Sequence, residues 1–173
     1  MKNPMSYKEF IDSAEQEHRV FIDSLHEQGQ LLDEGLQYIK DIKEDTNIVV
    51  FTETRCEDSA TTMPFLIKLA ELNKKLKVSF YRREGNEEIL EKLTGEKRVP
   101  TIVVLDKKGN PERHYIEFSK KLKQKLESSP IEETQSIIDD MRLGKYNGYI
   151  QEDLISFLTG KNYEYISFER KDK

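Results

Sequence analysis

The sequence predicts an α/β fold in which helices flank a mixed β-sheet, with an N-terminal helix and a helical C-terminal extension. Three observations predict this fold class. Short apolar runs rich in β-branched residues are typical of buried strands. Segments whose apolar residues recur at helical spacing lie between and around these runs. The last two apolar runs are joined by the short turn sequence KKGN, which is typical of a hairpin.

The first segment of the chain is predicted to be helical. Ser6 and Glu9 have the spacing of a capping box, in which two side chains each accept a hydrogen bond from a free backbone N–H. Gly29 and Gly35 indicate a break near residue 30, so the N-terminal helix is expected over residues 6–28. The apolar residues at helical spacing are Phe10, Ala14, Phe21, Leu25, Leu32, Leu36 and Ile39.

The middle of the chain is predicted to alternate between strands and helices. The expected elements are strand 47–53, helix 58–76, strand 77–83, helix 86–93, strand 100–106, turn 107–110 and strand 113–118. Strands separated by helices pair in parallel through right-handed crossovers, so the first three strands are expected to be parallel. The last strand is expected to add an antiparallel hairpin partner, which makes the sheet mixed.

The C-terminal extension, residues 119–173, is also predicted to be mostly helical. Ser129, Pro130 and Glu132 have the spacing of an N-cap, a first-turn proline and a capping partner. They predict a helix over about 130–143 that ends at the next glycine. The other elements expected in this extension are a turn at 147–148, a helix at 151–158 and an edge strand at 163–168.

Composition limits the classes of partner. There are 28 basic and 33 acidic residues, a net charge of −5, so we expect no nucleic-acid partner. No apolar run approaches the roughly 20 residues of a membrane helix, and the N-terminus carries no signal-peptide run. We therefore expect a cytoplasmic protein with no membrane partner. The three histidines and one cysteine do not have the spacing of a zinc site, so we expect no metal and no cofactor.

Cys56 is the one cysteine of the chain, and it directly follows the first predicted strand. In open α/β sheets, ligands bind at the carboxyl ends of the strands. The alternative is a buried apolar cysteine, but the surrounding sequence TRCEDS is polar on both sides. The sequence therefore predicts a partly exposed thiol with a function.

The middle of the chain resembles the thioredoxin superfamily at three positions. Cys56 lies where the family places its attacking cysteine, after the first strand. Pro64 lies eight residues later, where many members have a helix-kinking proline, and Pro100 lies 44 residues after Cys56, at the family's cis-proline loop. The resemblance covers about residues 30–118, the expected core of a single domain spanning residues 1–173. It is strongest to bacterial thioredoxin-like proteins with Cys-x-Asp-Ser or Cys-x-Asp-Cys motifs.

The chain departs from the family's C-x-x-C motif, because Ser59 stands at the position of the second cysteine. A dithiol enzyme uses that cysteine to resolve a mixed disulfide. The Ser59 hydroxyl can instead donate a hydrogen bond to the Cys56 thiolate. The resemblance thus implies a monothiol redox protein that acts on protein disulfides or low-molecular-weight thiols and is released by an external thiol. It also implies that Val99 and Pro100 hold the substrate.

Charged neighbours are expected to modulate the Cys56 thiol, because the thiolate is the nucleophile. A helix N-terminus after Cys56 favours the thiolate, and Arg55 acts in the same direction. Glu57 and Asp58 oppose it as like charges, although acids also suit a helix start. The sequence leaves the sum of these effects open.

Other interpretations also remain open at this point. Pro100 is compatible with a trans proline that begins an edge strand. Pro64 is compatible with a helix start that would leave Cys56 in a loop. The same fold could serve as a non-catalytic protein-binding module in which Cys56 is incidental. The N-terminal apolar stripe suits either a dimer seam or packing on the core, so the oligomeric state is undetermined.

Overall fold

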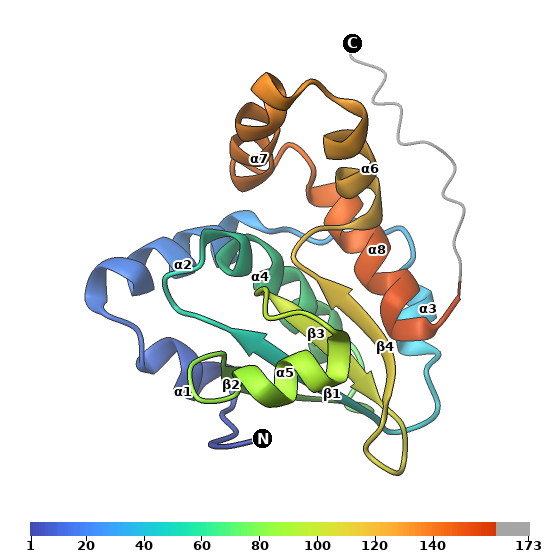
Figure 1. The fold of residues 1–173 in the computed structure, drawn as a ribbon. Coiled ribbons are helices and arrows are strands. Elements are labelled where there is room, and N and C mark those ends of the chain that lie inside the picture. The colour runs from blue at the N-terminus through green and yellow to red at the C-terminus, as the bar shows by residue number, and fades with distance from the viewer. Residues whose placement is uncertain (162–173) are drawn as a thin grey trace.

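The computed structural model describes residues 1–161, and four strands within them form one mixed sheet (Figure 1). Helices precede, connect and follow these strands. The strands are β1 (Thr46–Thr52), β2 (Leu76–Arg82), β3 (Thr101–Leu105) and β4 (Pro111–Ile116). The helices are α1 (Tyr7–Asp12), α2 (Gln16–Gln28), α3 (Leu36–Lys40), α4 (Glu57–Glu71), α5 (Glu87–Thr94), α6 (Lys120–Ser128), α7 (Thr134–Arg142) and α8 (Asn147–Thr159), with a 3₁₀ turn at Ile131–Glu133 before α7. The predicted α/β fold class is confirmed.

The order of the strands across the sheet is β2-β1-β3-β4. β1 and β2 are parallel, with Thr46 opposite Leu76 at one end and Thr52 opposite Arg82 at the other. β3 runs antiparallel to β1, and β4 runs antiparallel to β3. The mixed sheet and its terminal hairpin agree with the prediction, but the expectation that the third strand is parallel to the first is wrong.

The direction of β3 follows from the short connection that precedes it. An α5 of eight residues is about 12 Å long, whereas a seven-residue strand such as β1 spans about 23 Å. Because α5 is too short to carry the chain to the far end of the sheet, residues 95–100 return it to the carboxyl end of β1. β3 therefore starts beside the end of β1, with Thr101 opposite Phe51.

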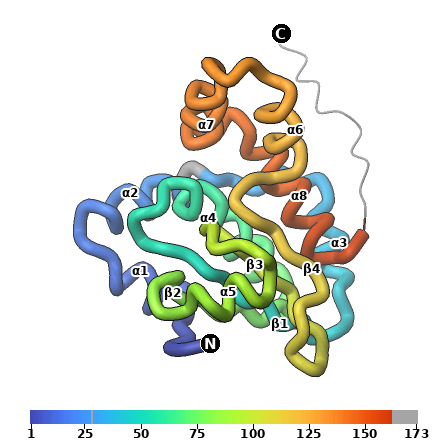
Figure 2. The backbone as a smooth tube through the Cα atoms, in the orientation of Figure 1, coloured from blue at the N-terminus to red at the C-terminus, as the bar shows by residue number. Residues whose placement is uncertain are grey.

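The two faces of the sheet are covered unequally. Side chains alternate along β1, so Val50 joins the larger core under α1, α2, α4 and α8, whereas Phe51 joins the smaller core under α5. Figure 1 shows α5 alone in front of the sheet and α2 and α4 behind it. Figure 2 follows the chain upward from β4 into α6 and α7, and then down through α8. The C-terminal helices thus return to the larger core.

The N-terminal region differs from the prediction of one helix over residues 6–28. The Ser6–Glu9 capping box is present at the start of α1. α1 ends at Ser13, whose hydroxyl donates to the carbonyl of Phe10, and such side-chain bonds compete with helix continuation. Met5 exchanges two backbone hydrogen bonds with Phe80, at 2.9 and 2.8 Å, and so covers part of the outer edge of β2.

The C-terminal extension is helical, but two of its details correct the prediction. Ser129 is not the N-cap of a following helix but the C-cap of α6, because Pro130 leads into the 3₁₀ turn and α7 begins only at Thr134. The pair at 147–148 does not turn the chain. Gly144, in the left-handed region at φ 87°, makes that turn, and Asn147 is the first residue of α8.

Two further expectations concern the end of the chain and the membrane. α8 ends at Gly160, in the left-handed region as the sequence predicts for a helix-stopping glycine. The expected strand at 163–168 lies outside the described residues. Among residues 1–161, no helix is both long enough and apolar enough to cross a bilayer.

Candidate functional site at Cys56

Cys56 lies between the end of β1 and the start of α4. It is the N-cap residue of α4, with extended backbone angles, and its carbonyl accepts the first helical hydrogen bond from Ala60 at 3.0 Å. Its side chain does not bind the free N–H groups of the helix, and the residue is partly exposed. The residue is therefore half-buried and sits at the positive end of a helix of 15 residues.

Pro64 lies inside α4 rather than at its start. Proline lacks a backbone N–H, so the carbonyl of Ala60 loses its usual helical partner there. The alternative in which the helix begins at Pro64 and leaves Cys56 in a loop is thus excluded. Arg55, on the other side of Cys56, has an exposed side chain.

The loop before β3 brings Val99 and Pro100 beside the thiol. The Val99–Pro100 peptide bond is cis. Cys56 Sγ donates a hydrogen bond to the carbonyl oxygen of Val99 at 3.6 Å. This hydrogen bond is available only to the protonated thiol, because a thiolate has no hydrogen to donate. Cys56 and Val99 are 43 residues apart in the sequence, and they are in contact, as the predicted site requires.

The loop is held in place by contacts on both sides of Pro100. The carbonyl of Pro100 accepts a hydrogen bond from the backbone N–H of Glu117 at 2.7 Å. The Thr101 hydroxyl donates to the carbonyl of Arg98 at 2.7 Å, and the Arg98 guanidinium binds the Glu117 carboxylate at 2.7 Å. These bonds fix the backbone of Val99 relative to the sheet.

Ser59 is placed differently from the expectation. Its side chain is almost fully buried, at 2% exposure, and its hydroxyl has no hydrogen-bond partner among the described residues. The expected hydrogen bond from Ser59 to the Cys56 sulfur is therefore absent in this state. A buried hydroxyl without a partner is costly, so it has the capacity to bind a group that enters the site.

A small cavity of about 10 Å³ connects these two residues. The N-terminal helices form its other side, and the sequence alone did not link them to the thiol. Burial, with a further effect from the charge of Asp23, raises the pKa of Tyr7 to about 12, so its hydroxyl keeps its proton at physiological pH. The lining residues are Tyr7, Phe10, Ile11, Ile22, Glu53, Cys56, Ser59, Ala60 and Met63.

The acids next to Cys56 have a cationic partner from a distant part of the chain. Arg142, the last residue of α7, donates from Nε to Asp58 Oδ1 at 2.9 Å. Its Nη1 lies 2.5 Å from Glu57 Oε2. Sequence reasoning missed Arg142, because 84 residues separate it from Asp58 and only the packing of α7 brings them together.

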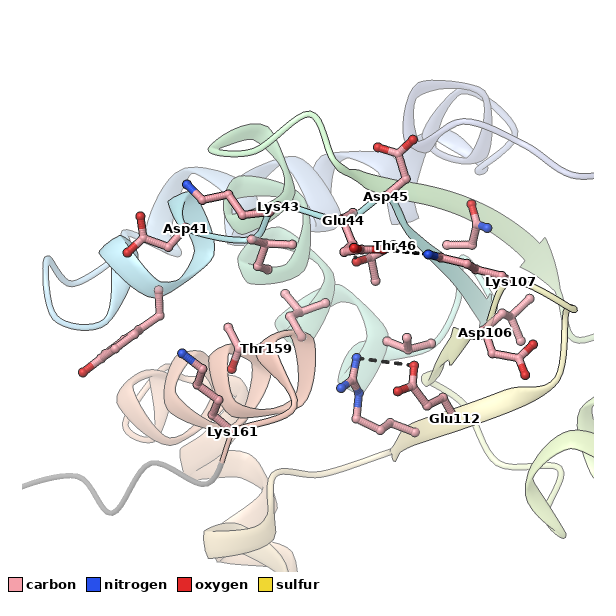
Figure 3. Close-up of a pocket in the computed structure, with 17 residues that line it drawn as sticks. Asp41, Lys43, Glu44, Asp45, Thr46, Asp106, Lys107, Glu112, Thr159 and Lys161 are labelled. Carbon is pink, nitrogen blue, oxygen red and sulfur yellow. Dashed lines mark hydrogen bonds and ion pairs between the residues drawn. The ribbon is translucent and has the colours of Figure 1, made fainter.

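A larger hollow lies at the opposite end of the sheet, around the start of β1 (Figure 3). It has a volume of about 440 Å³. Two pairs of its charged side chains lie together, Lys107 with Glu44 at 2.8 Å and Arg113 with Glu112 at 3.9 Å (Figure 3). This hollow lacks a thiol and lies away from Cys56, so we do not assign it to the same site.

No group of three or more histidine, cysteine, aspartate or glutamate side chains within residues 1–161 is arranged to hold a metal ion. The groups that the site brings together are the Cys56 thiol, the Ser59 hydroxyl and the Val99 backbone.

Comparison with known proteins agrees with this architecture. The family model described as Thioredoxin matches residues 4–135, so the chain belongs to the thioredoxin superfamily. The resemblance seen in the sequence covered about residues 30–118. The family model covers a longer range, because it also includes the N-terminal helices and α6. A search of curated proteins found no match.

Two solved structures share the fold across nearly the whole chain. One is a protein of unknown function from Pseudomonas aeruginosa, with a TM-score of 0.74 and 14% identity over 91% of this chain and 93% of that one. The other is an HIV epitope-scaffold, also with a TM-score of 0.74 and 14% identity, over 92% of this chain and 94% of that one. At this identity, both similarities establish the fold alone.

Proposed function

We propose that this thioredoxin-fold protein is a monothiol redox protein whose attacking group is Cys56. The observation that carries the proposal is the position of the thiol. It is partly exposed at the N-terminus of α4, and its sulfur lies 3.6 Å from the Val99 carbonyl. Ser59 lines the same small cavity as Cys56.

The first step is attack of the Cys56 thiolate on one sulfur of a substrate disulfide. A bond forms between the Cys56 sulfur and that sulfur, and the other substrate sulfur leaves as a thiolate. Once Cys56 has ionised, the Val99 carbonyl no longer receives the thiol hydrogen, so it can accept an N–H from an extended substrate. The Ser59 hydroxyl donates to the thiolate in this state, which requires a small rearrangement of its rotamer.

The second step releases Cys56. The thiolate of a low-molecular-weight thiol attacks the mixed disulfide at the substrate sulfur, and the Cys56 thiolate leaves. Ser59 occupies the position from which a second cysteine would act, so the protein itself does not supply this thiol. The net reaction exchanges one disulfide for another and neither consumes nor produces electrons.

The test is disulfide exchange between a peptide carrying a glutathione mixed disulfide and reduced glutathione, followed by release of the peptide thiol. We expect the parent protein to accelerate release and Cys56→Ser to give only the uncatalysed rate. Ser59→Ala is expected to retain part of the activity, because it removes one stabilising hydrogen bond. Equal rates for the parent and Cys56→Ser would refute the proposal.

A second candidate function is a protein-binding module without thiol chemistry. The buried Ser59 hydroxyl makes no hydrogen bond to the Cys56 sulfur, which favours this alternative. It predicts that any protein bound by the parent chain binds Cys56→Ser with unchanged affinity.

A further inference from the structure

The thiol of Cys56 is followed directly by two acids in the first turn of α4, Glu57 and Asp58. Acids at this position stabilise a helix through its dipole. The same negative charges oppose ionisation of the neighbouring thiol. A protein that uses a thiolate here therefore needs to offset them.

Arg142 offsets these negative charges through direct contacts. It binds both carboxylates with one guanidinium group, at 2.9 Å to Asp58 and 2.5 Å to Glu57. The Asp58 side chain is 14% exposed and that of Arg142 is 28% exposed. Their interaction is therefore less screened by water and salt than an ion pair on the open surface.

The other charges around the thiol do not replace Arg142. The carboxylate of Glu53, which lines the small cavity, already accepts from the backbone N–H of Glu84 at 2.9 Å and lies 3.7 Å from Arg82. Arg55 is exposed to solvent, where its charge is screened. The two acids of the first helical turn carry a charge of −2, and Arg142 reduces it to −1.

We propose that Arg142 is a positioning residue for the thiol, which offsets the charges of Glu57 and Asp58 and so couples α7 to the reactivity of Cys56. The inference rests on the proposed function, because it concerns the same thiolate. It assigns the C-terminal helices a role in the chemistry, in addition to their packing on the core.

The test is the pH dependence of the rate at which iodoacetamide alkylates Cys56, measured on the full chain. Arg142→Gln is expected to shift the midpoint upward by about half a pH unit or more, which at pH 7 is about a threefold loss of the reactive thiolate. Lys145→Gln is the matched control. It removes one positive charge from the same segment, but Lys145 pairs with Asp140 rather than with α4. We expect no shift for this variant.

A double variant without the two acids tests whether Arg142 acts on the thiol through them. In Glu57→Gln with Asp58→Asn, the midpoint is expected below that of the parent, and adding Arg142→Gln should shift it less than in the parent background, because the two carboxylates no longer hold the guanidinium beside the start of α4. This double variant keeps polar groups at the helix start, so it remains informative if Arg142→Gln alone fails to fold. Arg142→Lys keeps the charge but loses the two-pronged geometry, and an intermediate midpoint is expected.

Each outcome decides the inference. A midpoint that is unchanged in Arg142→Gln, or raised as much in Lys145→Gln as in Arg142→Gln, would overturn it. The proposed function is judged separately, by whether the parent forms and resolves a mixed disulfide. A reactive parent thiol that is insensitive to Arg142 would refute only the inference, and a parent that forms no mixed disulfide would refute the function itself.

Discussion

Ser59 is the residue that most restricts the chemistry of this chain. It occupies the third position after Cys56, on the first turn of the same helix. Residues three apart on a helix have their Cα atoms about 5 Å apart, which lies within the range of a disulfide. A thiol in place of the Ser59 hydroxyl would thus turn the monothiol site into a dithiol site, because this spacing of positions 56 and 59 already suits a disulfide.

This leads to a prediction for Ser59→Cys. On mild oxidation, the variant should form a disulfide between positions 56 and 59 and lose both free thiols, as counted with a thiol-specific reagent under denaturing conditions. The parent and Ser59→Ala, with one cysteine each, should retain one thiol per chain in the absence of an added disulfide. Two free thiols in the oxidised variant would show that the start of α4 does not have the geometry described here.

Individual residues of the site differ in how well the sequence predicts them. Cys56 and Pro100 could be paired from the sequence, because their positions, after one predicted strand and at the start of another, resemble the pattern of the thioredoxin superfamily. Arg142 and Tyr7 could not, because neither belongs to a motif and each reaches the site only through helix packing. The orientation of the Ser59 hydroxyl also depends on the packed state, since a serine rotates freely in the unfolded chain.

The elements of the fold were predictable where the apolar pattern is strong. β1, β2, β3 and α4 lie within one or two residues of the expected positions at most ends, although α4 stops five residues earlier than predicted, at Glu71. The direction of β3 was not predictable from alternation, because it depends on the length of α5 and its following loop. The start of α7 was missed because the residue after Pro130 enters a 3₁₀ turn instead of an α-helix.

The contact between α8 and the loop after α2 shows how the C-terminal extension supports the N-terminal region. The side chain of Gln151, only 3% exposed, accepts from the backbone N–H of Leu32 at 2.8 Å. Its amide group donates to the carbonyls of Leu32 at 2.8 Å and Glu34 at 3.2 Å. One buried side chain therefore satisfies three backbone groups of this loop.

Gln151→Ala is expected to lower the free energy of unfolding by about 1 to 3 kcal/mol, because it leaves buried backbone groups without partners. Chemical denaturation monitored by circular dichroism measures this difference. Gln37→Ala is the control, since Gln37 is exposed and donates only to Asp41; its effect should stay within about 0.5 kcal/mol. Similar small effects for both variants would mean that the contact of α8 with the loop does not stabilise the fold.

At the scale of the whole molecule, the pH dependence of stability reports on a half-buried acid in α8, Asp153. Burial raises the pKa of Asp153 above its ordinary value, and the nearby charge of Glu152 acts in the same direction. The backbone N–H of Lys120, which donates to Asp153 at 3.1 Å, and the charges of Lys120 and Lys123 oppose this shift. The folded state therefore holds this proton more tightly than the unfolded chain does.

A raised carboxyl pKa gives a contribution to stability that is complete below the unfolded value of about 3.9 and is lost as pH rises through the folded value. Asp153→Asn mimics the neutral carboxyl and should have a higher Tm than the parent at pH 7. That advantage should shrink towards pH 4. Asp45→Asn is the contrasting control. The hydrogen bond from Lys75 lowers the pKa of Asp45, so the loss of this carboxylate should lower the Tm less in acid than at pH 7. A Tm difference for Asp153→Asn that does not change with pH would contradict the assignment.

The central claim is that the fold makes Cys56 a better nucleophile than its local sequence alone would. The most direct measurement compares the folded chain with a six-residue peptide spanning positions 54–59, which carries the same neighbours without the helix or Arg142. Both are treated with glutathione disulfide at pH 7, and the rate of mixed-disulfide formation is followed by mass spectrometry. Cys56→Ser serves as the blank.

The account predicts one glutathione adduct per folded chain, formed at least about threefold faster than on the peptide. The account attributes this advantage to the position of the thiol at the N-terminus of α4, beside the Val99 carbonyl and near the guanidinium of Arg142 that binds Glu57 and Asp58. A folded chain that reacts at the same rate as the peptide, or more slowly, would contradict the account, because the fold would then give the thiol no advantage.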